Sequence, residues 1–373
     1  MILRISLLLL GALAFLAGIY GGLSRIGWPL PYGGSLVALH GPLLLSGVFG
    51  TLIGLERAVA LGQTWAYAAP VSSTVGTLLL LADVTFPLGA GAYVLASSLL
   101  LLASAVLAIR QPALFMVILV LGACAGLVGT ALWFMGTPVR DAVGWWLSFL
   151  ILTIAGERLE LSRLMPPRRG STPLFLTSIG LLAAGAGIGV TLKAGAILYG
   201  AALLVMTIWL LRHDIAVRNI RQTGQTRFFA TCMILGYLWL GLAGITPLVL
   251  PPDLRVWGYD LILHAILIGF VLSMVFGHAL IILPAVTRRR IAYSPLLYAP
   301  LFMLHASVLV RVGGDLTDWQ QAREWSGIVT ALAMITFGLC LARNARRSRP
   351  AKISGKPLRG ASEFHLSSGR NIG

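Results

Sequence analysis

The stretch that decides the fold is residues 112–136, which read PALFMVILVLGACAGLVGTALWFMG without a single charged side chain. A helix rises about 1.5 Å per residue, so about 20 apolar residues cross the hydrocarbon core of a bilayer, which is about 30 Å thick. An open sheet in lipid would leave its backbone N–H and C=O groups without partners. We therefore predict a transmembrane helix over this stretch.

Eleven other stretches have the same apolar character. The whole chain is 58% hydrophobic and 11% charged, whereas soluble domains carry about a quarter charged residues. We expect an all-α, polytopic integral membrane protein of about twelve transmembrane helices. The predicted spans are 2–23, 33–55, 64–82, 86–109, 112–136, 141–159, 172–190, 194–212, 229–250, 257–286, 293–312 and 326–343.

The net charge of +16 follows the topology of these spans. With the N-terminus on the cytoplasmic side, that side holds 22 of the 28 Lys and Arg residues, and the other side holds six. This asymmetry is the positive-inside pattern, and it predicts a bacterial-type inner membrane protein with both termini in the cytoplasm. The basic residues are then expected to contact anionic lipid and not nucleic acid. We interpret 1–345 as a single transmembrane domain and 346–373 as a basic, disordered cytoplasmic tail.

Short sequence similarities link spans 2, 6 and 10. Residues 46–50 of span 2 and 273–277 of span 10 share the pattern Ser-x-Val-Phe-Gly. Spans 2 and 6 both end in Glu-Arg. Three four-helix arcs around a pseudo-threefold axis would explain the similarities, and chance among glycine-rich apolar helices is the alternative.

The two Glu-Arg pairs are candidates for a structural charge clamp. Adjacent residues on a helix do not face each other, so we expect Glu56 to pair with Arg158 and Glu157 to pair with Arg57. A proton-entry role is the alternative.

Ionisable side chains within spans are costly and mark functional sites. His40, His264 and His305 are each about seven residues from the outer end of their predicted spans, a common depth of about 10 Å. Imidazole is a frequent metal ligand and the usual axial ligand of haem iron. We therefore interpret these histidines as haem or metal ligands, and hydrogen-bonded packing histidines are the alternative. Asp260, one turn before His264, would orient its ring, unless it is an interfacial helix-start residue.

His278 is predicted to lie about 21 Å deeper than His264. It is either a second metal-ligand site or a hydrogen-bonded packing residue. Arg25, Arg255 and Arg311 lie near the outer face, where they would snorkel to the interface or hold haem propionates.

Two regions carry a family resemblance. Trp28 with Leu39-His40-Gly41, and Asp260 through His264 to Gly277-His278 before three arginines, resemble the NnrS family. The resemblance implies twelve spans, haem and copper, and a role in nitric-oxide stress and denitrification. We take haem as the expected cofactor and copper as the alternative metal, with nitric oxide or a periplasmic electron carrier as partner.

The twelve-helix plan is also similar to subunit I of the haem-copper oxidases, whose ligands lie on the second, sixth and tenth helices. Span 6 of this chain has Trp145 and Trp146 but no histidine, and a copper site needs several convergent imidazoles. We therefore do not expect an oxygen-reducing oxidase, and whether the protein is an enzyme stays open. A twelve-helix secondary transporter and a cofactor-free membrane assembly factor are the alternatives.

Overall fold

The structure is a computed structural model that describes residues 2–163, 169–250 and 256–347. These residues form helices and no strand. In chain order the helices are α1 (Ile2–Arg25), α2 (Gly33–Val37), α3 (His40–Pro42), η1 (Leu43–Phe49), α4 (Gly50–Leu61), η2 (Thr64–Tyr67), α5 (Ala68–Leu81), α6 (Phe86–Arg110), α7 (Leu114–Phe134), α8 (Val139–Ser162), α9 (Ser171–Ile188), α10 (Lys193–His213), α11 (Ala216–Asn219), α12 (Gly224–Val249), α13 (Val256–His264), η3 (Ala265–Leu272), α14 (Ser273–Thr287), η4 (Pro295–Leu297), α15 (Tyr298–Thr317) and α16 (Gln320–Arg347).

The all-α membrane fold predicted from the sequence is confirmed. Eleven helices in the described part of the chain are long and apolar enough to cross a membrane. The predicted span 64–82 is shorter than expected, because a 3-10 turn occupies its first four residues and α5 has only 14 residues. Its hydroxyl groups face inward, and Ser73 and Thr77 are fully or almost fully buried. α5 packs between α4 and α6.

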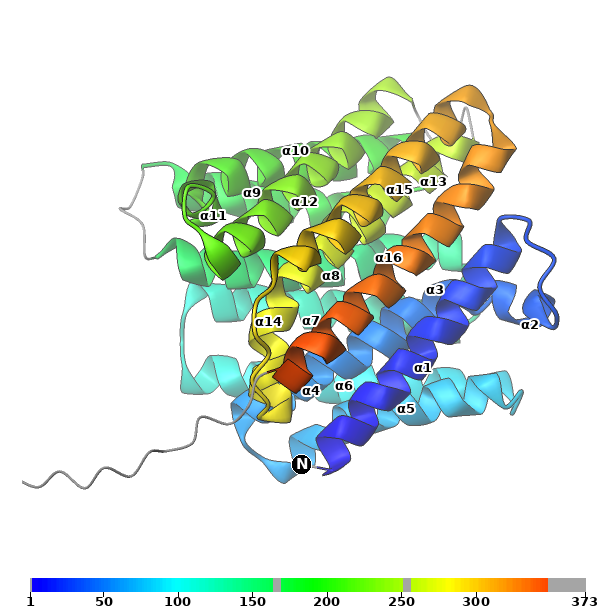
Figure 1. Ribbon diagram of the computed structural model, residues 1–373, viewed down its shortest axis with the longest axis horizontal. Helices are drawn as coiled ribbons and strands as arrows, with labels where there is room; N and C mark the ends of the chain where they lie inside the picture. The colour runs from blue at the N-terminus through cyan, green and yellow to red at the C-terminus, as the bar shows by residue number, and fades with distance from the viewer. Residues whose placement is uncertain (1, 164–168, 251–255, 348–373) are drawn as a thin grey trace, which may run out of the picture.

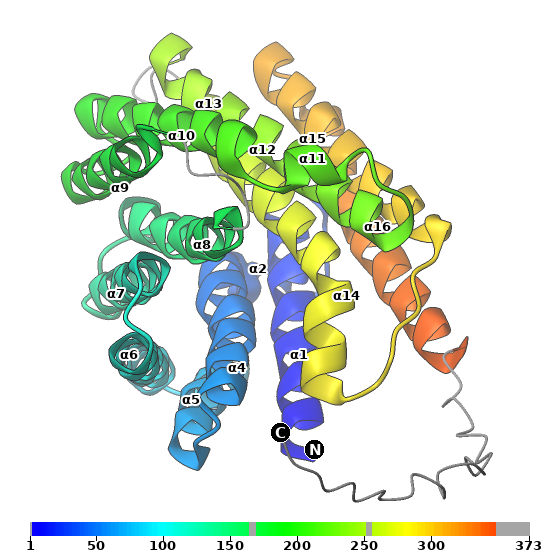
Figure 2. The ribbon, with the colours of Figure 1, turned by 90° about the vertical axis from the view of Figure 1, so that its left-hand side faces the viewer.

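Helices that follow one another along the chain pack side by side in the bundle, and α16 returns to contact α1 (Figures 1 and 2). At this closing contact the Trp28 and Trp325 rings meet edge to face with centroids 5.5 Å apart. The Trp28 indole also donates a hydrogen bond to the Glu324 carbonyl oxygen at 3.0 Å. The start of α1 and the end of α16 lie at the same end of the bundle (Figure 1). We call it the amino-terminal end, and the opposite one the far end.

The eleventh span ends later than predicted. The apolar run stops at Val312, but α15 continues to Thr317. The charged Asp315 is accommodated within the helix because Arg323 of α16 lies 3.0 Å from its carboxylate. α16 likewise extends to Arg347, two residues into the predicted tail. The rest of that tail, from residue 348, lies outside the described residues.

Two spans contain a long π-helical segment. η1 begins three residues after His40, and η3 begins directly after His264. π-Helical turns are rare and occur often at functional sites.

Candidate functional site

His40 lies at the far end of the bundle and packs against α1. Its Nδ1 is 2.6 Å from the carbonyl oxygen of Gly18, so Nδ1 carries the proton and donates. Gly22 lies against the Nδ1–Cε1 edge of the ring, and a methyl group added there would be only 2.5 Å from Cε1. The close approach of α1 therefore requires a glycine at this position.

His264 ends α13 and is oriented by Asp260. Its Nδ1 donates to the Asp260 carbonyl oxygen at 2.8 Å, and an Asp260 carboxylate oxygen lies 3.4 Å away. Arg311 of α15 holds the same carboxylate through Nη2 at 2.8 Å and Nε at 2.9 Å. The side chain of His264 keeps 18% of its surface exposed. Asp260 thus occupies the orienting position that its spacing predicted.

His40 and His264 lie within electrostatic range of each other. The charges of Arg25, Arg311 and Asp260 also act on His40. Within the described residues, the hydrogen bonds of both rings engage Nδ1 and leave Nε2 free. Metal-binding histidines are commonly arranged this way, with one nitrogen fixed by a carbonyl and the other available to a ligand. We call these five residues the histidine-pair site.

His305 belongs to a different site. The Trp239 indole donates to its Nδ1 at 2.8 Å, and its Nε2 lies 3.3 Å from the Ser273 hydroxyl. Both ring nitrogens are thus used within the protein. Because α15 extends to Thr317, His305 is twelve residues from the far end of its helix, or about 18 Å, and not the seven residues predicted. Trp239, on the ninth predicted span, gave no signal in the sequence that it would contact a histidine.

His278 lies near the amino-terminal end and also uses both ring nitrogens. Its Nδ1 donates to the Met274 carbonyl oxygen at 2.7 Å, and its Nε2 accepts from Arg158 at 2.8 Å. This geometry corresponds to the hydrogen-bonded alternative and not to a metal ligand. No group of three or more His, Cys, Asp or Glu residues suited to a metal ion is found in the described part of the chain.

The predicted charge clamp is present in part. Arg57 of α4 lies 3.7 Å from Glu157 of α8, as expected. Arg158, however, contacts His278 and lies 4.0 Å from Asp214, where Glu56 was predicted. Glu56 is instead a like-charged neighbour of Glu157. The clamp therefore joins α4, α8 and α14, the helices that correspond to spans 2, 6 and 10.

The sequence did not indicate Asp214 as a site residue, because it directly follows α10 in a segment predicted to be a linker. It is 1% exposed, and its carboxylate accepts the backbone N–H of Ala216. Burial raises the pKa of Asp214, while Arg158 and the Ala216 N–H act in the opposite direction. We call Arg57, Glu157, Arg158, Asp214 and His278 the charge cluster.

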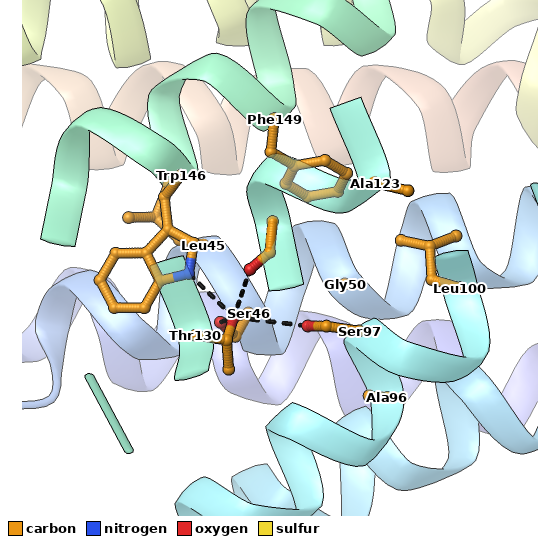
Figure 3. Close-up of a pocket in the computed structure, with 11 residues that line it drawn as sticks. Leu45, Ser46, Gly50, Ala96, Ser97, Leu100, Ala123, Thr130, Trp146 and Phe149 are labelled. Carbon is orange, nitrogen blue, oxygen red and sulfur yellow. Dashed lines mark hydrogen bonds between the residues drawn. The ribbon is translucent and has the colours of Figure 1, made fainter. Parts of the chain in front are cut away.

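A third polar feature is a small pocket among η1, α6, α7 and α8 (Figure 3). Thr130 is its centre: it accepts hydrogen bonds from Trp146 at 3.0 Å and Ser97 at 3.3 Å. The Ser46 hydroxyl is 3.5 Å from Thr130 as well. Hydroxyl and indole groups from four helices thus converge in an otherwise apolar region.

The fold and these sites define an all-α multi-pass membrane protein with polar clusters at both ends of its bundle. Residues 4–346 match the family described as Domain of unknown function (DUF8744), and the chain belongs to this family. No curated protein matches the sequence.

Proposed function

We propose that this protein is a membrane haem protein, similar to the NnrS family, in which His40 and His264 bind one haem iron through Nε2. The observation that carries the proposal is the hydrogen-bonding pattern that the two imidazole rings share. Each donates Nδ1–H to a backbone carbonyl, each leaves Nε2 without a partner in the described residues, and the two are electrostatic neighbours. Iron coordination would use both free nitrogens at once.

The charges around the pair suit a haem. Arg25 and Arg311 both act on His40 and would pair with propionates. Asp260 would hold the ring of His264 while remaining bound to Arg311. A haem held by two histidines supplies one-electron redox chemistry. Copper is the alternative metal for the two imidazoles.

The physiological proposal follows from the position of the site. His264 is eight residues from the start of α13, about 12 Å from the far end of the bundle. We propose that the far end faces the periplasm, where nitric oxide or a periplasmic electron carrier would be the partner. We propose that the protein acts in the nitric-oxide or respiratory stress response.

The orientation is part of the proposal. We propose a bacterial-type inner membrane protein whose amino-terminal end faces the cytoplasm. Two observations support it: α1 begins and α16 ends at one end of the bundle, and 22 of the 28 Lys and Arg residues fall on that side of the predicted topology. Positive charge is enriched in cytoplasmic segments.

The absorption spectrum of the full chain, purified in mild detergent after expression with added haem, tests this function. The wild type should show a Soret band. His40→Ala and His264→Ala should lose it, whereas His213→Ala, at the last residue of α10, should keep it. His264→Met should shift the band, because methionine is also an axial ligand. A His40→Ala protein with an unshifted, full-intensity band would show that the pair packs without binding haem.

A secondary transporter is the second candidate, and the pocket around Thr130 favours it. Carrier sites lie at helix interfaces near the membrane midplane, and four polar side chains converge there (Figure 3). A colourless wild type that takes up a small polar solute into vesicles, with uptake lost in Thr130→Val, would support the carrier in place of the haem protein.

A further inference from the structure

The charge cluster holds its ionic groups at distances too long for direct hydrogen bonds. Glu157 lies 3.7 Å from Arg57 and 3.9 Å from His278. Asp214 lies 4.0 Å from Arg158. Direct N–H···O hydrogen bonds are about 2.7–3.2 Å long, and polar contacts beyond about 3.5 Å are commonly bridged by water.

Several polar atoms of the cluster are buried without a hydrogen-bond partner among the described residues. They are Nη2 of Arg57, Nε and Nη1 of Arg158, and Oδ2 of Asp214. Arg158 is 2% exposed and Asp214 is 1% exposed. Buried water commonly satisfies such groups with two to four hydrogen bonds. The cluster therefore has the donors and acceptors of a small internal water site.

The charges around Glu157 do not balance when Glu56, a like-charged neighbour outside the cluster, is counted with it. Arg57 and Arg158 supply two positive charges. Glu56, Glu157 and Asp214 supply three negative charges when ionised. His278 is neutral, because its Nε2 accepts the hydrogen bond from Arg158. One uncompensated negative charge remains within the bundle, where an unpaired charge is costly.

Glu157 is the carboxylate that a proton would neutralise. The Ala216 N–H and Arg158 favour the anion of Asp214 and oppose the effect of its burial. Glu157 instead faces the like charge of Glu56 on α4, and Glu160 on its own helix adds a second one. The positive charges of Arg57 on α4 and Arg158 on α8 oppose this repulsion. Neutral His278 faces Glu157 from α14.

We propose that Glu157 is a proton-binding site, hydrated by water within the charge cluster and loaded from the amino-terminal end of the bundle. A hydronium ion transfers one proton to a carboxylate oxygen of Glu157 and becomes water, and no electron moves. The side chain keeps 24% of its surface exposed. Glu157 is five residues from the end of α8, about 8 Å along the helix, so it lies close to the water at that end of the bundle.

This proposal is independent of the haem, because it concerns the opposite end of the bundle. Infrared spectroscopy of the full chain in lipid nanodiscs detects the C=O stretch of a protonated carboxyl group, which shifts in D2O. At neutral pH the wild type should show this band and Glu157→Gln should lose it. Glu160→Gln, an exposed carboxylate one turn away on α8, should retain it.

Glutamine resembles a protonated glutamate in shape and charge, which makes the stability of the variant a second readout. Glu157→Gln should fold at least as well as the wild type near neutral pH. A carboxyl band that survives in Glu157→Gln, a wild type without the band, or a Glu157→Gln protein that no longer folds would each overturn the proposal.

Discussion

Replacement of Arg158 by methionine is the sharpest test of how the amino-terminal end of the bundle is held together. Arg158 has a 3% exposed side chain, donates to His278 at 2.8 Å and lies over the ring of Phe229 at 5.2 Å. Its Nε also lies 4.0 Å from the Asp214 carboxylate. Methionine retains much of the apolar volume but removes the charge.

The expected loss of stability follows from the charge of Asp214, which stays buried when Arg158 is removed. Removing one partner of a buried ion pair costs about 3–5 kcal/mol, because the other charge stays buried without compensation. We expect a loss of this size in the free energy of unfolding, measured by denaturant titration in mixed micelles. Arg163→Met, directly after the end of α8, is the matched control. Arg163 is exposed and lies over the Phe115 ring, and we expect a change within about 1 kcal/mol.

The stability of the Arg158→Met variant should depend on pH, and the direction of the change can be derived. Burial raises the pKa of Asp214 and Arg158 opposes that effect, so removing Arg158 raises the pKa further. The folded variant then holds a proton that the unfolded chain releases, and its stability increases as the pH falls toward 3.8, the ordinary pKa of aspartate. Asp214→Asn in the same chain should restore most of the loss. A loss below about 1 kcal/mol, or one that does not change with pH, would refute the buried-pair reasoning.

Three further predictions concern other parts of the molecule. Gly22→Ala should abolish haem absorbance, because the added methyl group would lie 2.5 Å from the His40 imidazole. Gly180→Ala, with open space around it, should not, and equal spectra of the two variants would contradict the packing of Gly22 against His40. Trp239→Phe should lower the free energy of unfolding by about 1–3 kcal/mol, because it leaves a buried imidazole nitrogen without its donor, and an unchanged denaturation midpoint would argue against that bond. In intact cells, an impermeant thiol reagent should label a cysteine at Trp319 and not one at Gln222, and the reverse pattern would invert the proposed orientation.

The amino-acid sequence by itself determined the membrane fold and the approximate course of its helices. Each span must satisfy its own backbone hydrogen bonds in lipid and must be apolar over its own length, so the information is local. The stretch 112–136 needs no partner to be recognised. The proximity of Asp260 to His264 was equally accessible, because four residues make about one helical turn.

Beyond the Arg57–Glu157 pair, which was expected from the sequence, tertiary structure decided which polar side chains of different helices meet. The sequence suggested that His305 shares the depth of His264, because the apolar run ends at Val312. In the structure α15 continues to Thr317, past Asp315 and its contact with Arg323, so His305 lies deeper below the helix end than the apolar run suggests. Likewise, the sequence suggested Glu56 as the partner of Arg158, but the fold places Asp214 beside it. Ion pairs between helices depend on rotation and on the choice of neighbours, and a nearly uniform apolar sequence carries little information about either, because lipid and protein interior are both apolar.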